Sequence, residues 1–96
     1  MTKQYILDFL KTHHVYLEER FAVEKIGLFG SYAKDKATLQ SDIDFYVTLK
    51  QKKLDNMAGL WNYLEESLGK KVDILFDHPK LRKGLKMVIE KEVLYA

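Results

Sequence analysis

Apolar residues recur along this chain with two different periods, and the changes of period predict an alternation of helices and strands. Near the N-terminus they follow a helical spacing, which predicts an amphipathic helix over roughly residues 2–19. The short apolar segment Val23–Phe29 predicts a strand that ends at Gly30. Ser31 then fits the N-cap of a short helical turn that continues through Ala37.

From Ser41 onward the apolar positions alternate with polar ones, which predicts a half-buried strand. Its apolar face carries Ile43, Phe45, Val47 and Leu49, and its polar face carries Asp42, Asp44, Tyr46 and Thr48. A second helical pattern over residues 54–68 ends at Gly69, a residue typical of helix C-termini.

The last third of the chain predicts one more strand and one more helix. Val72, Ile74 and Phe76 alternate, which leaves Asp73 on the opposite face, and a C-terminal helix begins just after Pro79. The resulting order is helix, strand, short helix, strand, helix, strand, helix. We therefore expect an α/β or α+β fold in which helices flank a mixed sheet of three to four strands.

Composition narrows the class of protein. The 96 residues suffice for one domain, residues 1–96, and hydrophobic and charged fractions of 47% and 31% are typical of a globular protein. The net charge of +2 gives no reason to expect direct binding of nucleic acid, and the absence of cysteine excludes thiolate chemistry. No segment is apolar enough to predict a signal peptide or a membrane span. We expect a cytoplasmic protein.

Three aspartates stand out because the strand pattern directs them away from the apolar face. Asp42 and Asp44 lie on the same side of one strand, with Cα atoms roughly 6.5 to 7 Å apart. If the strand that carries Asp73 is a neighbour, three carboxylates meet, and a shared divalent cation would relieve their repulsion. Hard oxygen ligands of this kind suit Mg²⁺, and two such ions can hold the attacking and the leaving oxygen of a phosphoryl displacement. The Gly30–Ser31 pair adds a close backbone approach and a hydroxyl for a phosphate.

The string "GSYAKDKATLQSDIDFYV" resembles the signature of the nucleotidyltransferase superfamily that includes DNA polymerase β and kanamycin nucleotidyltransferase. Gly-Ser, a spacer of about ten residues and Asp-x-Asp form that signature, and a third carboxylate follows downstream. The chain length is similar to that of the minimal nucleotidyltransferases, which are encoded beside HEPN-domain partners. The likeness extends through "KKVDILF" to the closing "KEVLYA".

The resemblance implies a role for each matching residue. Gly30 and Ser31 would hold the β- and γ-phosphates of ATP, with Lys34 as a further nucleotide ligand. Asp42 and Asp44 would bind two Mg²⁺ ions, and Asp73 would complete this catalytic and metal-binding set near the acceptor hydroxyl. The implied activity is transfer of AMP from ATP to a hydroxyl, in particular a tyrosine of a HEPN toxin, so that the protein acts as an antitoxin.

One departure keeps a different reading open. After Gly-Ser-x-Ala the family commonly has Arg-Gly, whereas this chain has Lys34-Asp35, which loses the bidentate guanidinium and adds a negative charge. The alternative is a catalytically weak or silent binding module that neutralises its partner by direct contact. A second alternative, a transferase acting on a small molecule such as an aminoglycoside, is disfavoured because it needs a further substrate-binding domain.

The remaining candidates have simpler interpretations. The three histidines, His13, His14 and His78, have no metal-binding spacing and are expected at the surface or the edge of the core. The basic cluster Lys80, Arg82, Lys83 and Lys86 is expected to be a solvated helix face. Trp61 and Tyr63 are expected in and beside the core. Neither the preferred base nor the oligomeric state can be predicted from these residues, and a homo-oligomer is compatible with them.

Overall fold

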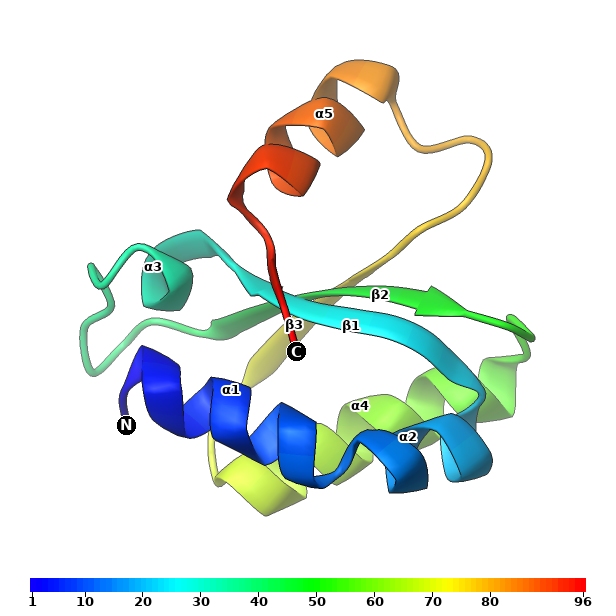
Figure 1. Cartoon of the computed structure of the whole chain (residues 1–96), viewed down its shortest axis with the longest axis horizontal. Coiled ribbons are helices and arrows are strands. Elements are labelled where there is room, and N and C mark those ends of the chain that lie inside the picture. Colours follow the sequence, from blue (N-terminus) through cyan, green and yellow to red (C-terminus); the bar gives the residue numbers. More distant parts are fainter.

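A four-stranded mixed sheet forms the centre of the molecule (Figure 1), and the computed structural model describes all of residues 1–96. The strands are β1 (Val23–Phe29), β2 (Ile43–Leu49), β3 (Val72–Phe76) and β4 (Leu94–Tyr95), arranged in the order β3-β2-β1-β4. β1 runs antiparallel to both β2 and β4, whereas β2 and β3 are parallel. This confirms the predicted mixed sheet.

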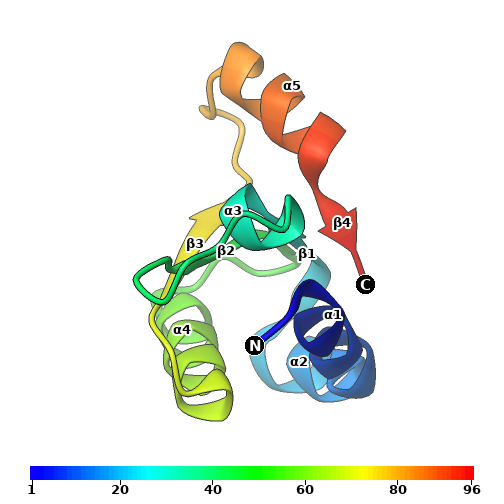
Figure 2. The ribbon, with the colours of Figure 1, turned by 90° about the vertical axis from the view of Figure 1, so that its left-hand side faces the viewer.

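The helices lie in two groups on opposite faces of the sheet (Figures 1 and 2). The helices α1 (Lys3–Thr12), α2 (His14–Phe21) and α4 (Leu54–Leu68) cover one face. The short helix α3 (Gly30–Ala33) and the C-terminal helix α5 (Lys83–Glu92) lie on the other face. None of these helices is long and apolar enough to span a lipid bilayer.

The hydrophobic core fills the layer between the sheet and the helices α1, α2 and α4. It contains 17 buried residues, among them the four alternating apolar residues of β2, Ile43, Phe45, Val47 and Leu49, each at most 5% exposed. Tyr63 packs against its edge, as predicted, and Trp61, which was expected in the core, is likewise only partly buried at its edge. Because this face of the sheet is fully used by the core, the other face is left for polar side chains.

The connection between α4 and β3 places the start of β3. Gly69 ends α4 in the left-handed conformation (φ 65°), as the sequence predicts. The indole N–H of Trp61 then donates to the carbonyl of Val72 at 3.1 Å, and the Val72 N–H donates to a carboxylate oxygen of Glu65 at 3.0 Å. The N–H and the carbonyl of Val72 are thereby both held to α4, directly before Asp73 in the chain.

Several predicted boundaries are wrong in detail. The single helix over residues 2–19 is two helices, because the backbone leaves the helical conformation at His13, whose imidazole Nδ1 lies 2.8 Å from the Phe9 carbonyl oxygen. Ser31 is not the N-cap of the short helix, since α3 already begins at Gly30 and ends at Ala33. The last helix begins at Lys83 and is followed by the two-residue strand β4, whose position the sequence did not reveal.

Candidate functional site

The polar face of the sheet brings two of the predicted aspartates side by side. Asp44 in β2 and Asp73 in β3 are register partners of parallel strands, so their side chains leave the sheet in the same direction. Asp42 is exposed and lies one residue before β2. The pairing of β2 with β3 therefore brings Asp44 and Asp73, which are distant in the sequence, together on one part of the surface.

The negative charges of these carboxylates affect one another. The pKa of Asp44 is raised above its usual value, first because Asp44 is partly buried and then because Asp73 and Asp42 place negative charge beside it. A cation would relieve this repulsion, and the oxygen-only ligand set is the one that Mg²⁺ prefers. The three side chains do not converge on one point, however, and no group of three or more His, Cys, Asp or Glu side chains is placed to hold an ion by itself.

Gly30 borders the aspartate site at the point where the chain leaves β1. Its backbone has a φ of +75°, and a Cβ atom at this position would collide with the carboxylate of Asp44. The reason is the antiparallel register, which sets Phe29 at the end of β1 opposite Asp44. A glycine is thus required twice, for its conformation and for the room that it leaves to Asp44. Ser31, the next residue, is half-buried in the first turn of α3.

Lys34 and Asp35, which replace the usual Arg-Gly, both form ion pairs. The Lys34 ammonium lies 3.0 Å from a carboxylate oxygen of Glu92 at the end of α5. The Asp35 carboxylate accepts from the Lys3 ammonium of α1 at 2.9 Å. Asp35 also has a φ of +57°, the left-handed conformation that favours glycine, the residue that the resemblance leads us to expect here. The extra negative charge is therefore paired with Lys3.

The loop between α3 and β2 is ordered by its own polar groups. The Thr38 N–H donates to the Ser41 hydroxyl oxygen at 2.9 Å, and the Lys70 ammonium donates to the Leu39 carbonyl at 3.0 Å. The Ile43 N–H donates to the Lys71 carbonyl at 3.1 Å. These contacts fix the chain on both sides of Asp42.

A second polar cluster on the same face was missed at the sequence level. Asp77 follows β3 and forms an ion pair with Lys86 of α5, with 3.2 Å between the ammonium nitrogen and the carboxylate oxygen. The phenol of Tyr46, which is only 2% exposed, lies beside them. Burial and then the Asp77 carboxylate raise the pKa of Tyr46. The alternation of Asp44, Tyr46 and Thr48 in β2 predicts this face, but not the helix that covers it.

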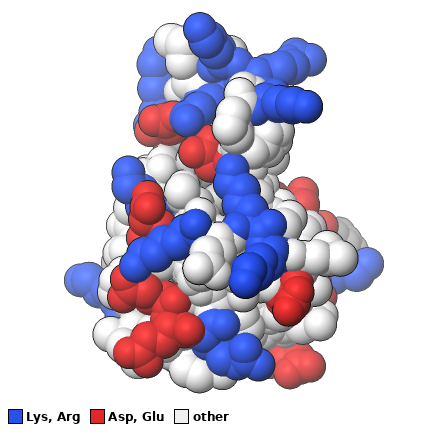
Figure 3. Space-filling view, turned by 90° about the vertical axis from the view of Figure 1, so that its right-hand side faces the viewer, with Lys and Arg blue, Asp and Glu red and all other residues white.

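Most of the other predicted surface residues lie where expected, and Lys86 is the exception. His14 and His78 are exposed, and His13 stacks on Phe9 with ring centroids 4.0 Å apart. Lys80, Arg82 and Lys83 are exposed around the start of α5, and Lys and Arg side chains dominate this end of the molecule (Figure 3). Only Lys86 turns inward, to Asp77.

Comparison with known proteins gives one family. The model described as polymerase beta, nucleotidyltransferase matches residues 11–96. A protein adenylyltransferase MntA of Thermococcus cleftensis is 35% identical over all of this chain and 97% of its own length. A solved structure of a protein proposed to be a minimal nucleotidyltransferase superposes with a TM-score of 0.82 at 26% identity, over 98% of this chain and 95% of its own.

A complex structure shares the fold at lower identity. It contains a tri-AMPylated HEPN toxin of Shewanella oneidensis together with an MNT antitoxin, and the matched chain has a TM-score of 0.61 at 18% identity. The match covers 93% of this chain and 70% of that one.

Proposed function

The chain belongs to the polymerase β nucleotidyltransferase family, and from this premise we propose that it is a protein adenylyltransferase that moves AMP from ATP to a hydroxyl group of a partner protein. The observation that carries the proposal is the registered pair Asp44–Asp73, with Gly30 held against the Asp44 carboxylate. This arrangement combines acidic side chains for the reacting phosphate with a close backbone approach for the leaving phosphates.

Each acidic side chain has a proposed role. Asp42 and Asp44 would hold Mg²⁺, two ions being expected, and Asp73 would lie nearer the acceptor. When bound, these ions neutralise charge on the transferring phosphate and activate the acceptor oxygen. The acceptor oxygen forms a bond to the α-phosphorus of ATP while the bond from that phosphorus to the bridging oxygen breaks. Pyrophosphate leaves, and an aspartate carboxylate takes the hydroxyl proton.

The leaving pyrophosphate is assigned to the side of α3. Gly30 offers its backbone without a side chain, Ser31 a hydroxyl, and Lys34 a positive charge. To bind phosphate, Lys34 must leave its ion pair with Glu92. The two side chains are 49% and 33% exposed, so breaking this ion pair costs little free energy.

The proposed acceptor is a tyrosine of a HEPN-domain toxin, so that the protein acts as an antitoxin. Support comes from the named adenylyltransferase relative and from the fold shared with an MNT antitoxin bound to an AMPylated HEPN toxin. The local surface is compatible with this acceptor, since none of the pockets of the domain is lined by Asp42, Asp44 or Asp73. A site on an open surface admits a side chain carried by another protein.

One observation favours the alternative of a silent binding module. The ion pair between Lys34 and Glu92 occupies one of the two lysines of the motif, the one that the resemblance assigns to the nucleotide. In that case the protein would neutralise its partner by contact alone.

Isotope position in ATP separates the two functions. The protein, Mg²⁺ and the proposed HEPN-domain partner are incubated with ATP labelled either at the α- or at the γ-phosphate. Adenylyl transfer predicts label on the partner from α-labelled ATP only, and its loss when the acceptor tyrosine of the partner is replaced by phenylalanine. Label from γ-labelled ATP would indicate a kinase, and no label from either would contradict the proposal.

A further inference from the structure

β3 is an edge strand of the sheet, and the helix α4 packs beneath it on the core face (Figure 2). One edge of β3 pairs with β2, and at its start the Ile43 N–H donates to the Lys71 carbonyl at 3.1 Å. Because the N–H and C=O groups of successive strand residues point alternately to the two edges, those of the next residue, Val72, face away from β2. Backbone groups at the edge of a sheet need another partner, such as water or a side chain.

Two side chains of α4 are the partners of Val72. The indole N–H of Trp61 donates to the Val72 carbonyl at 3.1 Å, and the Val72 N–H donates to a Glu65 carboxylate oxygen at 3.0 Å. Trp61 and Glu65 are four residues apart in α4 and therefore lie on the same side of the helix. Both bonds are partly buried, and the carboxylate acceptor makes the second a strong one. At Ile74 and Phe76, whose backbone faces the same edge, no side chain of α4 forms such a bond.

These bonds fix the two peptide groups that lead into Asp73. The peptide group between Lys71 and Val72 is held through its carbonyl by β2 and through its N–H by Glu65. The peptide group between Val72 and Asp73 is held through its carbonyl by Trp61. Because a peptide group is planar, fixing its carbonyl also fixes the direction of the Asp73 N–H on its other side. The backbone of Asp73 is therefore oriented from α4 as well as from β2.

Asp73 is a residue that needs such support. It is exposed, and its register partner Asp44 carries the same charge, so the two carboxylates repel one another. β2 lies between two strands, whereas β3 is paired on one side only, so this repulsion displaces Asp73 more readily than Asp44. A change of pairing by one residue would even turn Asp73 to the other face of the sheet.

We propose that Trp61 and Glu65 are positioning residues of the transfer site, which hold the Asp73 carboxylate beside Asp44 through their bonds to Val72. The inference rests on the proposed function, because it takes Asp73 to act at the acceptor hydroxyl. Trp61 and Glu65 belong to α4, which lies on the opposite face of the sheet from the aspartates, so they touch no reacting atom (Figure 1). They act only through the backbone of β3.

The test breaks the bond between Glu65 and Val72 and first measures the bond itself. Glu65→Leu removes the acceptor, whereas Glu65→Gln keeps an acceptor oxygen at the same reach. Glu66→Leu is the matched control, because Glu66 is the exposed next residue of the same helix. Amide hydrogen exchange should show the Val72 N–H at least about tenfold faster in Glu65→Leu than in the wild type or the control.

The second measurement is label transfer from α-labelled ATP to the proposed HEPN-domain partner. We expect Glu65→Leu to lower kcat about tenfold, because a small displacement of a catalytic group slows the reaction. The KM for MgATP should stay within about twofold of the wild type, since the phosphates are assigned to the side of α3. Glu65→Gln should recover most of the rate. Trp61→Phe removes the N–H and keeps an aromatic ring, so it should also lower kcat, and it carries the same comparison if Glu65→Leu does not fold.

Three results would overturn the positioning role. Rapid exchange of the Val72 N–H in Glu65→Leu with the kcat of the wild type would mean that the bonds only seal the edge of the sheet. An equal loss of kcat in Glu66→Leu would mean that any change on this helix disturbs the site, and a raised KM for MgATP at unchanged kcat would place the effect on nucleotide binding. In each of these cases the wild type would still transfer label. If the wild type transferred none, the proposed function itself would fail and the positioning role with it, while amide exchange would still report the bond to Val72.

Discussion

The carboxylate of Asp44 lies where a side chain on Gly30 would be, so these two residues form one structural unit at the meeting of β1 and β2. Gly30 follows β1 with a φ of +75° and is the first residue of α3, which therefore begins against the aspartate. The close approach explains why the motif pairs a glycine with an aspartate that lies fourteen positions later in this sequence. It also fixes the distance between the phosphate side and the acidic side of the proposed site.

Replacement of Gly30 by alanine should damage both stability and transfer. The left-handed conformation costs a residue with a Cβ atom roughly 1–2 kcal/mol, and the collision must also displace Asp44. Chemical denaturation should show a loss of at least about 1 kcal/mol in the free energy of unfolding, and label transfer should fall to background. Gly84→Ala is the matched control, because a Cβ there meets no atom within 4 Å. Equal behaviour of the two variants would contradict this account of Gly30.

Restoring glycine at position 35 should be tolerated. Asp35→Gly relieves the left-handed backbone at φ +57° and loses only the partly exposed ion pair with Lys3. We expect its free energy of unfolding to stay within about 1 kcal/mol of the wild type, because relief of the backbone offsets the lost pair. Asp35→Ala loses the pair without that relief and should be less stable than Asp35→Gly in the same denaturation experiment. The opposite order would mean that the Lys3 contact outweighs the backbone.

Release of Lys34 from Glu92 should strengthen nucleotide binding. Glu92→Gln removes the competing carboxylate, and exposed ion pairs of this kind contribute about 0.2–1 kcal/mol, which corresponds to an increase in affinity for MgATP of up to about fivefold. Added salt should reduce the difference between the variant and the wild type, because exposed charges are screened. Calorimetry at low and high salt measures both effects. Weaker binding by Glu92→Gln would show that Glu92 supports the site instead of competing with the phosphate.

The alkaline stability of the fold should depend on Tyr46. Burial, followed by the Asp77 carboxylate, Glu90 and Tyr95, raises the pKa of Tyr46 in the folded state. The unfolded chain therefore releases this proton first, and the stability contributed by the neutral phenol is complete below about pH 10 and is lost as the pH rises above it. Tyr46→Phe should flatten the fall of the unfolding free energy between roughly pH 10 and 12.

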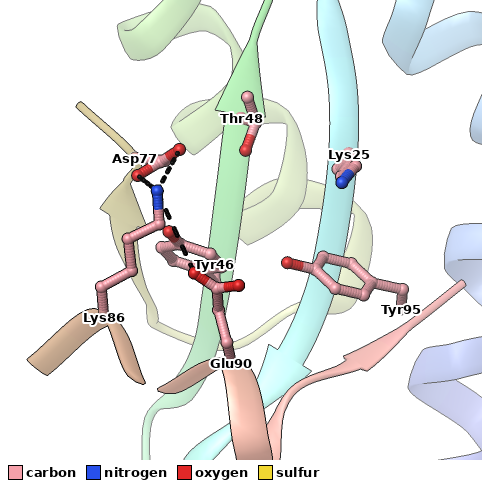
Figure 4. A pocket seen from close by; sticks show the side chains of 7 residues that line it. All are labelled: Lys25, Tyr46, Thr48, Asp77, Lys86, Glu90 and Tyr95. Atoms are coloured by element: carbon pink, nitrogen blue, oxygen red, sulfur yellow. Dashed lines mark hydrogen bonds and ion pairs between the residues drawn. The ribbon is translucent and has the colours of Figure 1, made fainter. Parts of the chain in front are cut away.

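A matched control separates Tyr46 from the other tyrosines. Tyr5→Phe removes a phenol that is 55% exposed on α1, outside the pocket of Figure 4. Denaturation across the pH range should give this variant the same slope as the wild type. Identical slopes for Tyr46→Phe and Tyr5→Phe would contradict the role assigned to the buried phenol.

The local features of the fold could be predicted because each depends on a short stretch of sequence. Alternation of apolar and polar residues identified β2 and the polar direction of Asp44, and Gly69 marked the end of α4. The pairing of Asp44 with Asp73 could only be stated conditionally, because strand order and register are set by packing across the whole sheet.

The features that escaped prediction depend on contacts distant in sequence. β4 has only two residues, and it pairs with β1 at Gly27, where a Cβ atom would collide with Val93. The partners of Lys34 and Asp35, Glu92 and Lys3, come from opposite ends of the chain. No local pattern identifies such pairs, and for the same reason the sequence did not show that Lys86 of α5 pairs with Asp77.

The central claim is that the aspartate site transfers AMP, and its most direct test is incorporation of α-labelled AMP into the HEPN partner by the wild type and by Asp44→Asn. The substitution keeps the shape of the side chain and removes the charge that the proposed chemistry needs, so formation of the complex, checked by co-purification, should be unchanged. The account predicts labelled, neutralised partner with the wild type, and unlabelled, active partner with Asp44→Asn. A variant that neutralises the partner as well as the wild type, or a wild type that adds no label, would contradict it.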